Sequence, residues 1–211
     1  MYTILVVDDS PMIVDVFVTM LERGGYRPIT AFSGEECLEV LDATPPDLIL
    51  LDIMMEPMDG WETLGKIKTN PATRDLPILM LTAKPLTPEE ANEYGAYIED
   101  YILKPTTHHQ LYDAIERVLA RRHSIAADIE RARAASVDPR IIDEYERLSK
   151  SVDINKRLLK ILETTYSIKD ARVGMGESIT RAIKSMAASI KLQEERLNEV
   201  RAQFADIFET Q

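Results

Sequence analysis

The chain has 211 residues, which is enough for one or two domains, and its apolar and charged fractions of 45% and 29% are typical of a globular protein. The formal net charge of −11 lies entirely in residues 1–122, because residues 123–211 hold 15 acidic and 15 basic side chains. Neither part has the basic excess that phosphate-backbone binding needs, so no nucleic acid partner is expected. The absence of a signal peptide or a membrane-length apolar run, together with the single Cys37, predicts a cytoplasmic protein that does not insert into a membrane.

The chain begins with an expected strand followed by a helix. Residues 3–7 form a β-branched run that ends in Asp8 and Asp9. Ser10 and Pro11 then supply an expected N-cap and a proline at the first helical position. Apolar residues at 3–4 spacing follow, as expected for a helix with one buried face.

The central strand is predicted by four apolar residues, 48–51, that run directly into Asp52. A turn signal, Asp59-Gly60, follows within eight residues. A short apolar run bounded by turn residues is typical of a strand buried on both faces, as in a parallel sheet. Asp52 is therefore expected at the carboxyl end of a buried strand, where open α/β sheets bind ligands. An aspartate at such a place can also be a helix cap or a turn former.

Three further strands are expected at residues 28–31, 77–82 and 101–103, the last two ending beside Thr82 and Lys104. Helical patterns that open at capping residues separate the strands, and Thr87-Pro88-Glu89-Glu90 has the spacing of a capping box. Five strands alternating with five helices predict a doubly wound α/β domain with a parallel sheet.

Polar side chains therefore follow four of the five expected strands. In a parallel sheet with right-handed crossovers, these strand ends share one edge. Three carboxylates, from Asp8, Asp9 and Asp52, would then face the Lys104 ammonium and the Thr82 hydroxyl. Like charges at close range disfavour joint ionisation, and a divalent cation would remove that conflict. Oxygen ligands with open positions for water and phosphate predict Mg²⁺.

This constellation resembles the receiver domain of two-component response regulators, over about residues 2–122. The matching residues are Asp8-Asp9, Asp52, Thr82-Ala83 and Lys104-Pro105. The resemblance implies a flavodoxin-like sheet with strand order 2-1-3-4-5, an order known for such proteins. A flavodoxin-like domain whose strand ends are polar by chance is the alternative.

The resemblance also implies a role for each acidic residue. Asp52 would be the phosphoacceptor. Asp9 and Asp52 would bind Mg²⁺ together with the main-chain carbonyl of Met54, and Asp8 would assist through water. The protein would not be an enzyme in the usual sense, but a phosphoacceptor that promotes its own phosphotransfer and dephosphorylation, with a sensor histidine kinase as its partner.

Three further residues are implied to respond to the phosphoryl group. Lys104 would pair with the acceptor carboxylate and then with the phosphoryl group, and the Thr82 hydroxyl would hydrogen-bond a phosphoryl oxygen. Tyr101 would be the aromatic residue that moves with it, or else an ordinary edge-strand aromatic. These roles agree with phosphoryl transfer, which needs an in-line nucleophile, a metal and fixed positive charge.

The sequence departs from the family at two places. The family usually has Met-Pro at the third and fourth positions after the acceptor, whereas Met55 and Glu56 stand here, with Pro57 one place late. The distance from Asp52 to Asp59-Gly60 is kept, so the loop is expected to differ while the metal site survives. Met54 and Lys84 occupy positions that the family associates with the lifetime of the phosphoryl group, and the lifetime cannot be carried over.

The tail predicts long helices. No Gly or Pro interrupts residues 107–135, so the last receiver helix is expected to continue into a helical linker, residues 123–138. Helices at 139–173 and 177–211, each about 50 Å long, flank a glycine turn and suggest an antiparallel hairpin. A longer parallel coiled coil is the alternative. The expected domains are thus a receiver at 1–122, the linker, and a hairpin at 139–211.

In the first tail helix a second apolar stripe, Ile154, Leu158, Ile161 and Ile168, widens the apolar face. The expected hairpin therefore has apolar faces too wide to bury alone, which predicts a homodimer. Asn155 and Gln193 at core-type positions either fix the helix register or are simply tolerated there. The tail resembles no known family, so it is expected to serve dimerisation and an unidentified output protein. The alternatives are a phosphoryl sink or relay carrier with a purely structural tail, and a DNA-binding transcriptional regulator.

Overall fold

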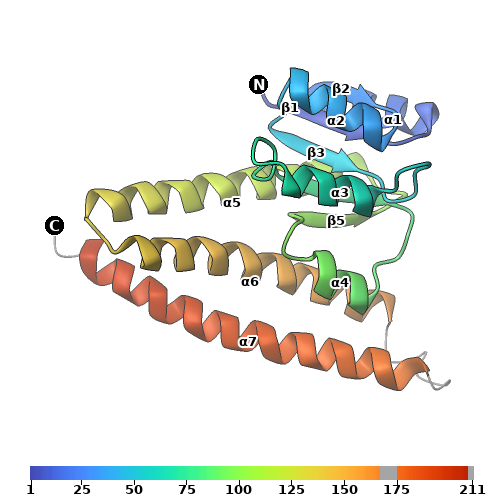
Figure 1. Ribbon diagram of the computed structural model, residues 1–211. Coiled ribbons are helices and arrows are strands. Elements are labelled where there is room, and N and C mark those ends of the chain that lie inside the picture. Colours follow the sequence, from blue (N-terminus) through green and yellow to red (C-terminus); the bar gives the residue numbers. More distant parts are fainter. Residues whose placement is uncertain (167–174, 209–211) are drawn as a thin grey trace. The chain divides into compact units, whose positions relative to one another are not determined.

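The computed structural model describes residues 1–166 and 175–208 (Figure 1). Its five strands form one sheet, and every pairing in that sheet is parallel. The strands are β1 (Thr3–Val7), β2 (Arg27–Ala31), β3 (Leu48–Leu51), β4 (Ile78–Thr82) and β5 (Asp100–Leu103). Their order is β2-β1-β3-β4-β5, which confirms the predicted fold class.

The helices of the described residues follow the expected alternation with the strands and then continue beyond it. They are α1 (Pro11–Arg23), α2 (Gly34–Ala43), α3 (Gly60–Thr69), α4 (Pro88–Tyr94), α5 (His108–Ala134), α6 (Pro139–Thr165) and α7 (Met175–Phe208). Thr87 caps α4 in a full capping box with Glu90, as its sequence pattern predicts. Ser10 is the N-cap of α1 and Pro11 is its first residue, as predicted, although the Ser10 side chain makes no capping hydrogen bond.

The core of the sheet consists of its three inner strands, β1, β3 and β4. All residues of β3 and β4 are buried, because helices or loops cover both faces of a parallel sheet. Cys37 on α2 is also fully buried, and burial raises the pKa of its thiol to about 12. Cys37 is therefore a core residue with no reactive thiolate at neutral pH.

The chain divides into two compact units. The first contains residues 1–85 and 97–118 and holds the whole sheet. The second contains residues 86–96 together with the chain from Leu119 onward. Helix α4 therefore belongs with the C-terminal helices, although it lies between β4 and β5 in the sequence. No helix among the described residues is long and apolar enough to cross a membrane.

The second unit has a core that three helices share rather than two. The end of α5 contributes Ile129 and Ala132, which are buried together with residues of α6 and α7. The other members of this core are Ile142, Tyr145, Leu148, Val152, Leu197 and Val200. The continuation of α5 beyond the receiver is thus a packed helix, whereas the sequence suggested only a linker.

A second apolar stripe of α6 is also buried within the chain. Ile154 and Leu158 are 1% and 0% exposed. Leu158 lies against the end of α4, where a Cβ on Gly95 would come 3.0 Å from its Cδ1 atom. The expectation of a dimer relied partly on this stripe being uncovered, and the burial of Ile154 and Leu158 within the chain removes that part of the reason.

The two long helices are held in register by polar contacts as well as by apolar packing. Asn155 Nδ2 lies 3.4 Å from Gln193 Oε1, and the Ser151 hydroxyl donates to the same oxygen at 3.2 Å. Helix α6 ends at Thr165, eight residues earlier than expected. The predicted glycine turn at Gly174 falls outside the described residues.

Candidate functional site

The sheet order brings together the strand ends that the sequence singled out. Strand β1 lies beside β3 with Val7 opposite Leu51, so the next residues, Asp8 and Asp52, are neighbours at one edge. On the other side of β3, the main-chain N–H of Lys104 donates to the Thr82 carbonyl at 2.8 Å. All four polar strand ends therefore meet at the carboxyl edge of the sheet, as predicted.

Three carboxylates form the centre of the site. Asp8, Asp9 and Asp52 each place an oxygen within 4.8 Å of the others. Asp8 and Asp52 are 3% and 5% exposed, whereas Asp9 is exposed. Oxygen donors at this spacing, with one side open to solvent, fit a hard divalent cation such as Mg²⁺.

Main-chain N–H groups fix the two buried carboxylates. The N–H of Ile53 donates to Asp52 Oδ1 at 2.7 Å, and the N–H of Ser10 donates to Asp8 Oδ1 at 2.9 Å. In each carboxylate the other oxygen, Oδ2, faces the Lys104 ammonium. The carboxylates are therefore oriented before any ligand arrives.

Lys104 bridges two of the three acidic residues. Its Nζ atom lies 3.1 Å from Asp52 Oδ2 and also hydrogen-bonds Asp8 Oδ2. The lysine side chain is only 13% exposed, so solvent screens these contacts weakly. One ammonium facing three carboxylates leaves the cluster net negative, which favours binding of a cation.

The loop from β3 to α3 approaches the site very closely. The N–H groups of Met55 and Gly60 both donate to the Ile53 carbonyl, at 3.1 and 3.0 Å. A Cβ atom on Gly60 would lie 2.1 Å from the Asp52 carbonyl oxygen, so only glycine fits there. The three carboxylates lie together although Pro57 comes one position later than the proline usual in the receiver family. Met54 is 53% exposed beside them.

Thr82 and Tyr101 are joined through the backbone of Lys84, a link that the sequence analysis missed. The Lys84 N–H donates to Thr82 Oγ1 at 3.2 Å, and the Tyr101 hydroxyl donates to the Lys84 carbonyl at 2.6 Å. Tyr101 is 3% exposed, and its ring stacks on Trp61 with the centroids 6.5 Å apart. Tyr101 therefore lies inward on β5, which is an edge strand of the sheet.

This fold and this cluster of strand-end residues define a receiver domain. The family model of the response regulator receiver domain matches residues 4–116, more than half of the chain. The chain belongs to this family. A second family model, described as "Metanogen output domain 2", matches residues 121–207, the part in which the sequence analysis recognised no family.

Curated relatives match the receiver part. The chain is 39% identical over 124 residues to the alkaline phosphatase synthesis transcriptional regulatory protein PhoP of Bacillus subtilis, which covers 59% of this chain and 50% of that protein. It is 40% identical over 105 residues to a probable cyclic di-GMP phosphodiesterase of Vibrio cholerae. This match covers 50% of this chain and 24% of that protein. The chain thus spans half or less of the length of these relatives.

Solved structures also match the receiver part. The chemotaxis protein CheY4 of Vibrio cholerae is 31% identical, with a TM-score of 0.53, and covers 56% of this chain and 98% of its own. The N-terminal domain of a response regulator receiver protein from Methanoculleus marisnigri JR1 is 90% identical over 57% of this chain and 98% of its own, with a TM-score of 0.49.

Proposed function

We propose that the protein is a response regulator that accepts a phosphoryl group on Asp52 from a sensor histidine kinase and signals through its C-terminal helices. The observation that carries this proposal is the position of Asp52, between the Lys104 ammonium at 3.1 Å and the carboxylates of Asp8 and Asp9. A carboxylate paired with a fixed cation stays ionised, which a nucleophile requires.

The residues of the cluster would share the work of phosphoryl transfer. Asp9, Asp52 and the main-chain carbonyl of Met54 would hold Mg²⁺, with Asp8 assisting through water; the bound ion supplies charge stabilisation for the phosphoryl oxygens. Lys104 would keep Asp52 oriented and then pair with the phosphoryl group. The protein thereby promotes its own phosphorylation and dephosphorylation, without turning over a separate substrate.

The hydrogen bonds around Lys84 provide a route out of the site. Thr82 would turn its hydroxyl toward a phosphoryl oxygen. This turn would disturb the hydrogen bond that Thr82 Oγ1 accepts from the Lys84 N–H. Because Tyr101 donates to the carbonyl of the same Lys84, both switch residues act on the segment that leads into α4. Residues of α4 pack on α6 and α7, which gives the signal a path to the tail.

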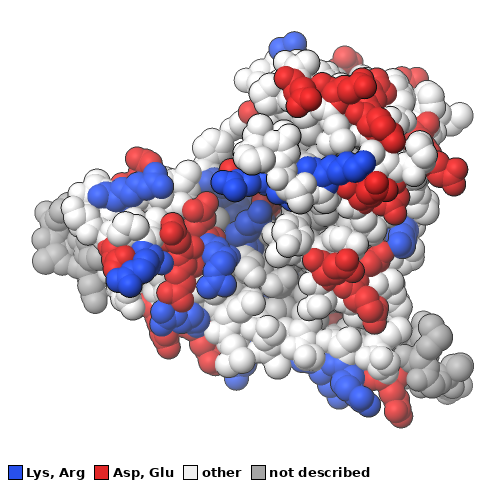
Figure 2. Space-filling model, viewed as in Figure 1, with Lys and Arg blue, Asp and Glu red and all other residues white. Residues whose placement is uncertain are grey.

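The tail supports a protein-binding output better than a DNA-binding one. Acidic and basic side chains alternate along it, and the face drawn in Figure 2 shows no purely basic patch over α5 and α6. Its sequence matches a different output family model, whereas the transcriptional relatives match the receiver part. A phosphoryl sink with a purely structural tail is the alternative.

We expect a phosphoryl mimic to change the hydrogen exchange of the helices that leave the receiver. Beryllofluoride with Mg²⁺ should alter amide exchange across residues 107–135 in the wild type and much less in Thr82→Ala, because the hydroxyl that reads the phosphoryl group is then missing. Hydrogen exchange followed by mass spectrometry measures this change. A response confined to the loops around Asp52 and Lys84 would show that the tail receives no signal.

We further propose that the protein is a homodimer through its C-terminal helices before any phosphorylation. Leu192 on α7 is 68% exposed, and burying a leucine side chain contributes about 1.5–3 kcal/mol. Sedimentation of the full chain at micromolar concentration should give the mass of a dimer, and Leu192→Glu should shift it toward the monomer. A wild-type monomer would contradict the proposal.

A further inference from the structure

Trp61 joins the loop beside the phosphoacceptor to the aromatic ring of Tyr101. It is the second residue of α3 and directly follows Gly60. The Trp61 residue is 8% exposed, and its ring stacks on Tyr101 with the centroids 6.5 Å apart and the planes inclined by 28°. Aromatic pairs at this separation attract each other beyond the area that they bury. A displacement of one ring is therefore expected to displace the other.

The start of α3 is in turn fixed to the strand that carries the acceptor. The Gly60 N–H donates to the Ile53 carbonyl at 3.0 Å, and a Cβ atom on Gly60 would lie 2.1 Å from the Asp52 carbonyl oxygen. The loop that ends at Gly60 also carries Met54, whose main-chain carbonyl is a proposed ligand of Mg²⁺. Filling the phosphoacceptor site therefore acts on the residues directly before Trp61.

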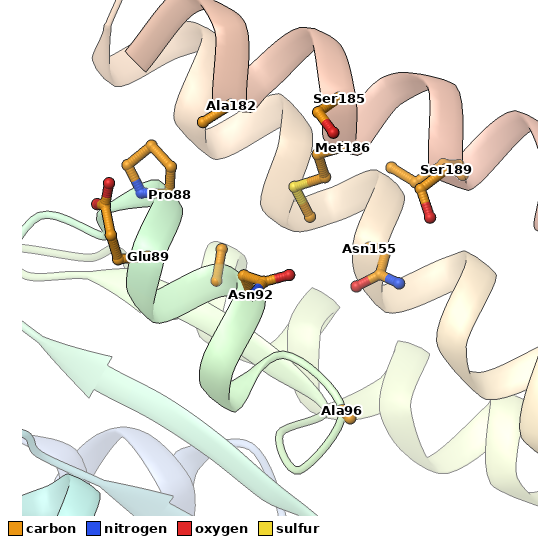
Figure 3. Close-up of a pocket in the computed structure, with 11 residues that line it drawn as sticks. Pro88, Glu89, Asn92, Ala96, Asn155, Ala182, Ser185, Met186 and Ser189 are labelled. Carbon is orange, nitrogen blue, oxygen red and sulfur yellow. The ribbon is translucent and has the colours of Figure 1, made fainter. Parts of the chain in front are cut away.

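The contacts around Trp61 and Tyr101 are buried, unlike those in the groove where α4 meets α6 and α7 (Figure 3). That groove has a volume of about 460 Å³ and is lined mainly by exposed or half-buried side chains, including the exposed Glu89, Ser185 and Ser189. Side chains on an open surface can take up a small displacement without passing it on. Close-packed buried groups transmit it, because there is no free space beside them.

Two separate chains of contacts connect Asp52 to Tyr101. One runs through Thr82 and the main chain of Lys84, whose carbonyl accepts a hydrogen bond from the Tyr101 hydroxyl at 2.6 Å. The other runs through the start of α3 and Trp61, and it reaches the ring of Tyr101 rather than its hydroxyl. The two chains of contacts share no residue between Asp52 and Tyr101. Loss of one therefore leaves the other in place.

We propose that Trp61 is a positioning residue for Tyr101, through which occupation of the phosphoacceptor site reaches Tyr101 even when Thr82 cannot respond. This inference rests on the proposed function, because it takes Asp52 as the acceptor and Tyr101 as a switch residue. Removing the Thr82 hydroxyl leaves the part of the response that passes through Trp61. Removing the indole leaves the part that passes through Thr82, and only the loss of both abolishes the response.

The test follows amide hydrogen exchange of strand β5, residues 100–103, in the full-length protein with and without beryllofluoride and Mg²⁺. Thr82→Ala and Trp61→Leu should each reduce the wild-type change by about half, and the double variant should abolish it, because the effects of independent routes add. Trp61→Phe keeps an aromatic face for Tyr101, so it should retain most of the wild-type change. A residue that only filled space would be replaced as well by leucine as by phenylalanine.

Leu41→Ala is the control for a general loss of packing. Leu41 is 5% exposed on α2, which packs on β2, and β2 and β5 lie at opposite edges of the sheet. This variant should be less stable than the wild type, because it leaves a cavity in the core, but it should keep the full exchange response of β5. Loss of the response in Leu41→Ala would show that destabilisation alone explains the Trp61→Leu result.

Phosphoryl labelling of the wild type separates this inference from the proposed function. A wild type that takes up no phosphoryl group from acetyl phosphate and Mg²⁺ would contradict both. In a wild type that is labelled, an unresponsive β5 would overturn the role of Trp61 alone. A full response in Trp61→Leu, a complete loss of response in Thr82→Ala, or equal responses in Trp61→Phe and Trp61→Leu would do the same.

Discussion

Replacing Asp52 by asparagine is expected to abolish phosphoryl incorporation from acetyl phosphate and Mg²⁺. The wild type should gain one phosphoryl group, because Asp52 is the buried carboxylate that lies 3.1 Å from Lys104 and within 4.8 Å of Asp8 and Asp9. Asparagine keeps the shape of the side chain but has no nucleophilic oxygen. Intact-mass spectrometry measures the labelled fraction, which should fall to background in the variant.

Two controls make this experiment decisive. Asp75→Asn changes an aspartate that is 88% exposed and lies outside the cluster, so it should be labelled as fully as the wild type. EDTA should suppress labelling of the wild type, because three carboxylates with one ammonium are net negative and repel an incoming phosphoryl group unless a metal ion neutralises them. Full labelling of Asp52→Asn, or labelling that persists in EDTA, would show that the assigned acceptor or the assigned metal dependence is wrong.

Replacing Gly60 by alanine is expected to destabilise the receiver by about 3 kcal/mol or more, since it forces an atom into occupied space. The added Cβ would lie 2.1 Å from the Asp52 carbonyl oxygen and 2.7 Å from Ile53 Cα, both of which are backbone atoms that cannot turn aside. The backbone beside the acceptor would have to move, so phosphoryl labelling should fall as well. Urea denaturation measures the free energy of unfolding.

Gly65→Ala provides the matched control for this substitution. Gly65 lies in the same helix, α3, and a Cβ there would meet nothing within 4 Å. Alanine is the better helix former by about 1 kcal/mol, so this variant should be slightly more stable than the wild type and normally labelled. A Gly60→Ala protein as stable as Gly65→Ala would show that the loop has room that the structure does not indicate.

Helix α4 groups with the C-terminal helices although it follows a strand of the receiver. The segment after Thr82 leads from the carboxyl edge of the sheet into α4, which packs on the C-terminal helices. Gly95 at the end of α4 lies against Leu158 of α6, a residue that is fully buried. Helix α4, which lies between two strands of the receiver in the sequence, therefore packs against a C-terminal helix directly.

The sequence alone determined the sheet and the residues that cluster at its carboxyl edge. The apolar run before Asp52 predicts a strand buried on both faces, and parallel crossovers then bring the ends of four strands to one edge. Local signals of this kind depend on residues close together in the chain, which is why the Thr87 capping box was also predicted correctly. They require no knowledge of which distant surfaces meet.

The tertiary structure alone decided what covers each apolar face. The spacing of Ile154 and Leu158 shows that α6 has a second apolar stripe, but spacing does not say whether a second copy, α4 or α5 covers it. The link from Thr82 to Tyr101 through the Lys84 backbone was hidden for a similar reason, because main-chain groups leave no signature in side-chain patterns. The orientation of Asn155 likewise depends on a partner 38 positions away in sequence, and only the packed helices bring the two together.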